Sequence, residues 1–196
     1  GMSGMASVTG FPDGPPVKFG PPIADIAAGM FTATAIVSAL FAREQDPERK
    51  GQYVTTSMLG GQLAMLTYMA GTYFNTGKVL MRNGNRHAII TPYDTFPTAD
   101  GYVNIAVGND AIWQRFCGAM GMAEQAIDPR YTTNADRLEN IEPLYEAIEI
   151  AMGTMTTAEI VEKLDSAAVP CGPIYTIGEI MEDPQVADQE LRVRVP

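Results

Sequence analysis

The chain has 196 residues, of which 46% are hydrophobic and 18% are charged, a composition that suits one globular domain or slightly more. Its formal net charge is -10 and it has no lysine- or arginine-rich run, which argues against nucleic acid or an anionic membrane surface as a general partner. Cys117 and Cys171 are far apart and have no metal-ligand spacing. We therefore expect reduced core thiols, no metal site and a cytoplasmic location.

A proline-rich loop with the run FPDGPP, starting at Phe11, leads into a long apolar segment. Proline is favoured in the first helical turn, so Pro21 and Pro22 predict a helix that begins near Ile23. Between residues 26 and 42 there is no charged side chain, and small residues are mixed with large apolar ones, which predicts a helix buried on most sides. This segment is slightly short for a membrane span and contains glycine, threonine and serine, so a buried helix of a soluble protein is preferred.

Asp25 is the one charged residue near the start of this helix. Backbone N–H groups and the helix dipole favour negative charge there, so an N-terminal cap or a first-turn acid is the simple interpretation. The alternative is a carboxylate nucleophile held ionised at the edge of a dry pocket. Spacing alone does not choose between the two.

Residues 44–76 predict a turn, a short strand and a second helix. Asp46-Pro47 ends the first helix. Residues 52–57 are rich in tyrosine, valine and threonine, as a strand is. Residues 58–76 contain few charges and predict a helix whose methionine and aromatic side chains fill a core.

The stretch KVLMRNGNRH, residues 78–87, contains a turn around Gly84. Backbone N–H groups in such a turn can point at an anion or a carbonyl group. His87 is the only histidine, so any imidazole acid–base chemistry within this chain would have to use it. A lone loop histidine is more often structural or merely exposed, and both interpretations stay open.

The residues that follow predict a small domain with strands and helices. Residues 91–98 and 102–107 flank an Asp-Gly pair, which indicates a hairpin. Asp110 is expected to cap the next helix rather than to act on a substrate. An amphipathic helix is predicted over residues 133–152. Two capping boxes then occur at Thr156-x-x-Glu159 and Thr176-x-x-Glu179, and each predicts the start of a short helix.

Together these motifs resemble the middle of the family III CoA-transferases, the group that includes formyl-CoA transferase. The resemblance is carried by FPDGPP, by IAD before the small-residue helix, by ALFAR at its end, by KGQYVTTSM and by PYDTFPTADGYV. The family pattern G-x-G-Q is only partly kept, because Arg49 stands in place of the first glycine. Some relatives also have several consecutive glycines in a loop that closes over the active site, where this chain has only Gly84.

The resemblance implies that Asp25 is the catalytic aspartate. Relatives have a loop that closes over the active site at the position of Gly84, so Gly84, Asn85 and His87 are the residues expected to contact the substrate. The resemblance further implies transfer of coenzyme A between an acyl-CoA and a small carboxylic acid through an aspartyl anhydride and an aspartyl thioester. Acyl-CoA is then a substrate, and no permanently bound cofactor is expected. Two alternatives stay open: proton abstraction beside the thioester, as in the alpha-methylacyl-CoA racemases of the same superfamily, and a non-catalytic scaffold.

The resemblance also implies an α/β fold within a family of interlocked homodimers. Residues 1–77 are expected to belong to a partial Rossmann-like large domain with helices and a strand, residues 78–187 to a smaller α+β domain, and residues 188–196 to a linker back to the large domain. The chain is expected to be the middle and later part of a longer protein. As an isolated piece it is expected to be inactive and to expose the apolar faces of residues 26–42 and 58–74.

Overall fold

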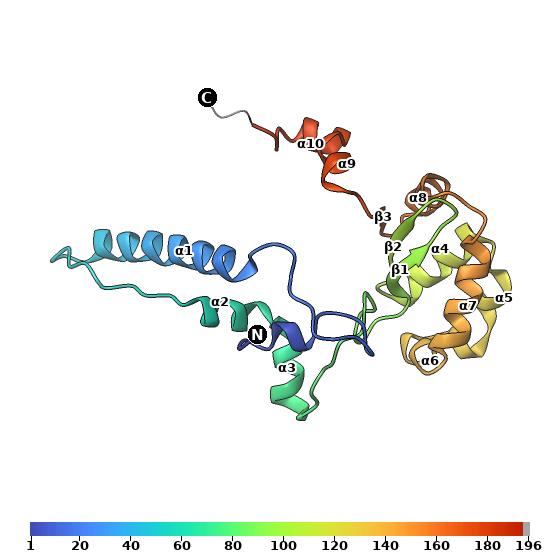
Figure 1. Ribbon diagram of the computed structural model, residues 1–196, viewed down its shortest axis with the longest axis horizontal. Helices are drawn as coiled ribbons and strands as arrows, with labels where there is room; N and C mark the ends of the chain where they lie inside the picture. Colours follow the sequence, from blue (N-terminus) through green and yellow to red (C-terminus); the bar gives the residue numbers. More distant parts are fainter. Residues whose placement is uncertain (194–196) are drawn as a thin grey trace. The chain divides into compact units, whose positions relative to one another are not determined.

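A computed structural model describes residues 1–193, and the chain divides into two compact units, Gly1–Gly84 and Asn85–Pro196 (Figure 1). Residues 1–84 form helices and loops, whereas the second unit combines helices with a three-stranded sheet. The expected α/β class is therefore confirmed. The strand predicted at residues 52–57 is wrong: this segment has no strand partner within the described residues and leads directly into a helix after Ser57.

The first unit contains a short 3-10 helix and three α-helices: η1 (Met5–Ser7), α1 (Ile23–Gln45), α2 (Met58–Met65) and α3 (Thr67–Thr76). Helix α1 begins at the residue that the proline pair predicts and ends immediately before Asp46, so both of its predicted ends are confirmed. The single helix predicted over residues 58–76 is interrupted at Leu66. The next residue, Thr67, has a φ of 45°, in the left-handed region that a continuous α-helix does not use.

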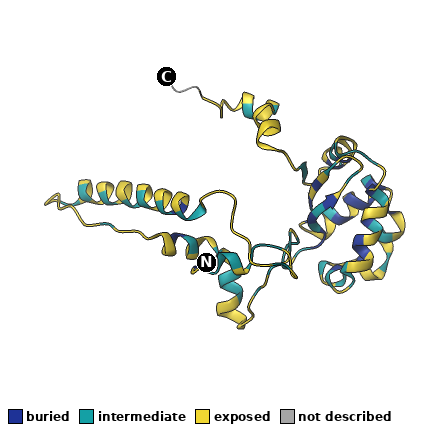
Figure 2. Ribbon diagram, in the orientation of Figure 1, coloured by how far each residue is buried: buried dark blue, intermediate teal, exposed yellow. Residues whose placement is uncertain are grey.

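The expectation that α1 is buried on most sides is wrong for the described residues (Figure 2). Ala27 is its one buried residue, and Met30, Val37 and Phe41 are 66%, 66% and 68% exposed. The reason is that α1 packs chiefly against α2, and a single neighbouring helix covers only one stripe of a helix surface. The apolar faces of α1 and α2 are thus exposed, which was the expectation for residues 26–42 and 58–74 in the absence of the rest of a longer protein.

By length and composition, α1 is also the one helix among the described residues that could cross a membrane. A helix from the core of a soluble protein can have the same length and composition. The expectation of no membrane partner remains a prediction.

The second unit packs helices against one face of an antiparallel sheet with the strand order β1-β2-β3. Its elements are β1 (Tyr93–Pro97), β2 (Tyr102–Ala106), α4 (Asp110–Met120), α5 (Ala123–Ile127), η2 (Pro129–Tyr131), α6 (Asn134–Glu139), α7 (Ile141–Met152), α8 (Thr157–Ser166), β3 (Cys171–Pro173), α9 (Ile177–Met181) and α10 (Pro184–Asp188). The predicted hairpin is confirmed, with a register that runs from Tyr93 opposite Ala106 to Pro97 opposite Tyr102. Strand β3, which the sequence did not predict, pairs with β2.

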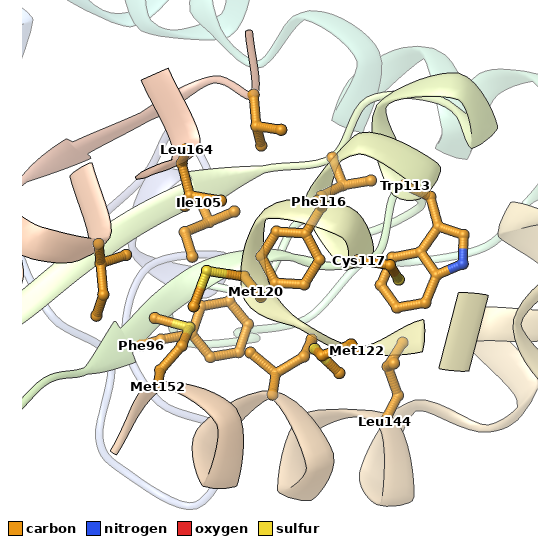
Figure 3. Close-up of a cluster of buried hydrophobic side chains, with 14 of the residues drawn as sticks. Phe96, Ile105, Trp113, Phe116, Cys117, Met120, Met122, Leu144, Met152 and Leu164 are labelled. Atoms are coloured by element: carbon orange, nitrogen blue, oxygen red, sulfur yellow. The ribbon is translucent and has the colours of Figure 1, made fainter. Parts of the chain in front are cut away.

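The hydrophobic core lies between this sheet and helices α4, α7 and α8 (Figure 3). Alternate residues of the hairpin, including Phe96, Val103 and Ile105, are buried in it, as the two-residue period of a strand requires. On α4, the rings of Trp113 and Phe116 stack with their centroids 5.7 Å apart. Apart from Ala27, every buried hydrophobic residue of the described chain belongs to the second unit.

Both cysteines are free thiols. Cys117 is fully buried in α4, and burial raises the pKa of its thiol to about 12, so the expected core thiol is confirmed there. Cys171 lies in β3 and is half-buried, with its Sγ 3.9 Å from the carbonyl oxygen of Val161.

The helix predicted over residues 133–152 is in fact two helices, α6 and α7, separated at Asn140. The cause is Pro143, because a proline has no N–H to donate and its ring clashes with the carbonyl group four residues earlier, at Glu139. Pro143 instead falls in the first turn of α7, where a proline is tolerated. Both predicted capping boxes are confirmed, and α8 and α9 begin at them.

Candidate active site

Asp25 lies in the first turn of α1 and is exposed. The backbone N–H groups of Asp25 and Ile26 both donate to the carbonyl oxygen of Pro22, at 3.1 Å. The Asp25 carboxylate forms no hydrogen bond or ion pair with any residue between 1 and 193. It therefore lies at the positive end of a long helix and contacts no cation within this described range.

A close contact between small residues fixes the start of α1 on α2. A Cβ atom added at Gly61 of α2 would lie 3.3 Å from the Cβ of Ala27 and 3.4 Å from the backbone nitrogen of Ala28, so a larger side chain would push the helices apart. Further along, the hydroxyl groups of Thr32 and Thr56 share a hydrogen bond of 2.6 Å. Asp25 precedes Ala27 by two residues, so the position of Asp25 depends on the contact between Ala27 and Gly61.

The loop with the FPDGPP motif packs against the turn at Gly84. Gly84 has a φ of 62°, and its N–H donates to the carbonyl oxygen of Gly10 at 3.0 Å. A Cβ atom at Gly84 would lie 3.1 Å from the ring of Phe11, and the Nε of Arg82 donates to the carbonyl oxygen of Phe11 at 3.3 Å. The N–H of Gly84 is therefore engaged within the protein. A substrate contact at Gly84 stays a prediction, and it would have to use another part of this turn.

Asn85 and His87 belong to the second unit, whereas Asp25 and Gly84 belong to the first. Asn85 is exposed in the turn. The ring of His87 stacks on Tyr93 of β1, with a centroid separation of 5.0 Å and an interplanar angle of 16°. The N–H of His87 donates to the carbonyl oxygen of Tyr93 at 2.9 Å, and its Nδ1 accepts from the N–H of Ile89 at 3.3 Å. His87 is thus held to β1, and its predicted contact with the substrate stays a prediction.

Asp110 does not cap α4 as predicted. The cap is Asn109, whose side chain accepts from the N–H of Ile112 at 2.9 Å, and Asp110 is the first residue of the helix. The Asp110 carboxylate instead accepts a hydrogen bond of 2.8 Å from the fully buried guanidinium group of Arg137. This pairing gives Asp110 a structural role.

Arg86 is a charged residue of this region that the sequence did not single out. It contacts Asp94 of β1 and Glu142 of α7, the second of which is 56 positions away in the chain. No local pattern could have revealed that pairing, because only the fold brings the three side chains together. Among the residues the structure describes, no cluster of three or more histidine, cysteine, aspartate or glutamate side chains could hold a metal ion.

A protein-family model described as CoA-transferase family III matches residues 1–196. The chain belongs to this family. Similar curated relatives are the acetyl-CoA:oxalate CoA-transferase of Acetobacter aceti, 37% identical over 98% of this chain and 49% of that protein, and the succinate–glutarate CoA-transferase of Agrobacterium fabrum, 38% identical over 98% of this chain and 48% of that protein. The chain therefore spans about half the length of these relatives.

A solved structure agrees with this assignment to family III. A CAIB/BAIF family protein from Brucella suis superposes with a TM-score of 0.81 at 33% sequence identity. The match covers 98% of this chain and 50% of that protein. The expected membership in the family III CoA-transferases is thus confirmed.

Proposed function

We propose that the protein to which this chain belongs is a CoA-transferase that moves coenzyme A from an acyl-CoA to a small carboxylic acid, with Asp25 as the nucleophile. The observation that carries the proposal is the exposed Asp25 carboxylate, which has no hydrogen-bond or ion-pair partner among residues 1–193, in the first turn of α1 of a family III chain. A nucleophile has to be accessible and must not be neutralised by a neighbouring cation. The names of the two relatives support small dicarboxylic acids, such as oxalate, succinate or glutarate, as acceptors.

In the proposed reaction, a carboxylate oxygen of Asp25 attacks the thioester carbonyl carbon of the donor. The carbon–sulfur bond breaks, the thiolate of coenzyme A leaves, and a mixed anhydride links the acyl group to Asp25. The thiolate then attacks the Asp25 carbonyl carbon, which releases the first acid as a carboxylate and leaves an aspartyl thioester. The acceptor carboxylate repeats these two steps in reverse and leaves as the new acyl-CoA, so that Asp25 is regenerated.

The start of α1 also offers a hydrogen-bond donor for the oxyanion that forms in each attack. The N–H groups of Ile23, Asp25 and Ile26 are bonded to the carbonyl groups of Pro21 and Pro22. Within the described residues, the N–H of Ala24 has no backbone acceptor. A free N–H at a helix start can stabilise developing negative charge, and Ala24 precedes the nucleophile by one residue.

The test is a transfer assay on the full-length protein with acetyl-CoA or succinyl-CoA as donor and oxalate or glutarate as acceptor. Replacing the nucleophile in Asp25→Asn is expected to reduce turnover by roughly a thousandfold or more. The matched control is Asp188→Asn, which removes an exposed acid of α10 and should leave turnover unchanged. Turnover that survives in Asp25→Asn would contradict the proposal. Deuterium exchange beside the thioester without any movement of coenzyme A would support the racemase alternative instead.

We also propose an interlocked homodimer with a Rossmann-like large domain in the full-length protein, and a cytoplasmic location. The exposed apolar faces of α1 and α2 support a further covering surface, because contiguous apolar patches of this kind are uncommon on isolated soluble proteins. Sedimentation of the full-length protein tests the dimer, and a monomer at micromolar concentration would contradict it.

A further inference from the structure

We propose that Gly61 is a positioning residue for Asp25: because Gly61 has no side chain, the first turn of α1 can lie where the Asp25 carboxylate attacks the thioester. This inference rests on the proposed function, and all of its contacts lie within residues 1–84. Among the residues of α2, all of which the structure describes, Gly61 alone is buried. Its nearest neighbours there are Ala27 and Ala28 of α1.

A methyl group at position 61 could not be accommodated by a change of rotamer. Its three nearest atoms would be the Cβ of Ala27 at 3.3 Å, the nitrogen of Ala28 at 3.4 Å and the carbonyl carbon of Ala27 at 3.5 Å. None of these atoms can rotate out of the way, so only a movement of one helix relieves the contact. Unstrained carbon atoms lie about 3.5–4.0 Å apart, which gives a movement of roughly half an ångström.

α2 is held in place on both sides of Gly61 along the chain. Ser57 caps the helix, and its side chain accepts from the N–H of Gly60 at 2.9 Å. Gln62, the residue after Gly61, accepts a hydrogen bond of 2.7 Å from the hydroxyl group of Ser3, which is only 4% exposed. We therefore expect α1, rather than α2, to yield to a larger residue at position 61.

α1 is held to the segment before α2 at one further point. The hydroxyl group of Thr32 donates to the carbonyl oxygen of Ala28 at 2.7 Å, and it lies 2.6 Å from the hydroxyl group of Thr56. A hydroxyl group has one hydrogen atom, so Thr56 is the donor in the second bond. α1 is thus attached at Thr32, further along the helix than the place where a methyl group on Gly61 would push it.

A push at Ala27 is therefore enlarged at Asp25. With a rise of about 1.5 Å per residue, Ala27 lies about 7.5 Å and Asp25 about 10.5 Å from Thr32 along the helix axis. If α1 turns about Thr32, a movement of roughly half an ångström at Ala27 becomes about 0.7 Å at Asp25. A misplacement of about 1 Å can lower a rate by roughly a hundredfold. A displaced nucleophile slows the attack without removing a contact to the donor, so kcat should fall and KM should not.

The test is coenzyme A transfer by the full-length protein with the donors and acceptors named above. We expect Gly61→Ala to lower kcat by about 10- to 100-fold and to leave KM within about twofold of the wild type. The matched control is Gly71→Ala in α3, where a Cβ atom meets no atom within 4 Å, and it should change neither constant. A kcat within about twofold of the wild type in Gly61→Ala would overturn the inference.

A size exchange across the contact separates positioning from a loss of stability. Combining Gly61→Ala with Ala27→Gly moves the methyl group from α1 to α2 and removes the nearest atom that it would meet. The double variant should regain a kcat within about fivefold of the wild type. Glycine weakens a helix, so if Gly61→Ala acted only by destabilising the fold, adding Ala27→Gly would lower kcat further. A further fall would overturn the inference.

Hydrogen exchange tests the same contact without relying on activity. In Gly61→Ala, the amides of residues 27–30 in α1 should exchange with deuterium at least about fivefold faster than in the wild type, and the double variant should restore their protection. Unchanged exchange in Gly61→Ala would contradict the inference. An inactive wild-type protein with the expected exchange pattern would overturn only the proposed function.

Discussion

Arg137 and Arg130 have the same kinds of partner but opposite exposure. Arg137 pairs with Asp110 and lies 5.4 Å from the centre of the Trp113 ring, while Arg130 pairs with Asp128 and lies 5.2 Å from the Tyr131 ring. The Arg137 side chain is completely buried, whereas that of Arg130 is 57% exposed. Arg137 also donates to backbone carbonyl groups, at 2.8 Å to Thr91 and 3.0 Å to Tyr131. It therefore ties α6 to the segment before β1, to η2 and to α4.

We predict that Arg137→Met lowers the free energy of unfolding by roughly 3 kcal/mol or more, because the buried carbonyl groups of Thr91 and Tyr131 lose their donors. Arg130→Met is the matched control and should change it little, since its ion pair is in water. Urea denaturation followed by Trp113 fluorescence measures both variants. Equal losses in the two variants would contradict this account of Arg137.

At the residue scale, the sequence was most informative where one position carries the signal. The proline pair located the start of α1, and with it the place of Asp25 in the first turn. The burial of Arg137 could not be predicted, because an arginine within the charged run TNADRLEN looks like part of a solvated face. Its partners at Thr91 and Asp110 are 46 and 27 positions away, and only the tertiary structure brings them together.

At the scale of elements, helix starts were easier to predict than helix continuity. The capping boxes of α8 and α9 were predicted correctly because the Thr-x-x-Glu pattern is local. A third box, Thr133 with Asp136, was missed because aspartate takes the place of the usual glutamate. The strand predicted at residues 52–57 was wrong because a strand needs a neighbour, and sequence composition does not supply one.

The capping box of α8 gives a pH-dependent prediction. The Thr156 side chain accepts from the Glu159 N–H, and the backbone N–H and hydroxyl group of Thr156 donate to the Glu159 carboxylate, which lowers the pKa of that carboxyl group. We expect Thr156→Ala to cost about 1 kcal/mol of unfolding free energy near neutral pH. Thr154→Ala is the control, because the exposed Thr154 forms no hydrogen bond within the described residues.

The cost of Thr156→Ala should shrink in acid. A carboxyl group whose pKa is lowered by folding contributes stability above its unfolded pKa and loses that contribution as the pH falls through its folded pKa. The hydrogen bond from the Thr156 hydroxyl group to the Glu159 carboxylate is therefore weakened at low pH in the wild type, which narrows the difference between the two proteins. Denaturation curves at pH 7 and pH 3 measure this difference. A difference that grows at pH 3 would contradict the assigned role of Glu159.

At the scale of the whole molecule, the two units differ in how much hydrophobic core the residues of this chain provide for each of them. The second unit has a continuous core of buried residues between its sheet and helices. The first has Ala27 as its only buried hydrophobic residue, although α1 and α2 are strongly apolar. Hydrophobic patterning in the sequence predicted an apolar helix correctly, but it could not say which surface covers that helix. Patterning measures the tendency to be buried and does not identify the partner.

The central claim, that Asp25 takes the acyl group onto its own carboxylate, is tested most directly by trapping. The full-length protein is incubated with an acyl-CoA and hydroxylamine, which attacks anhydrides and thioesters, and is then digested for mass spectrometry. We predict a hydroxamate on Asp25 that depends on the acyl-CoA and is absent from Asp25→Asn. An unmodified Asp25 during continuing transfer of coenzyme A, or a hydroxamate on another acidic residue, would contradict it.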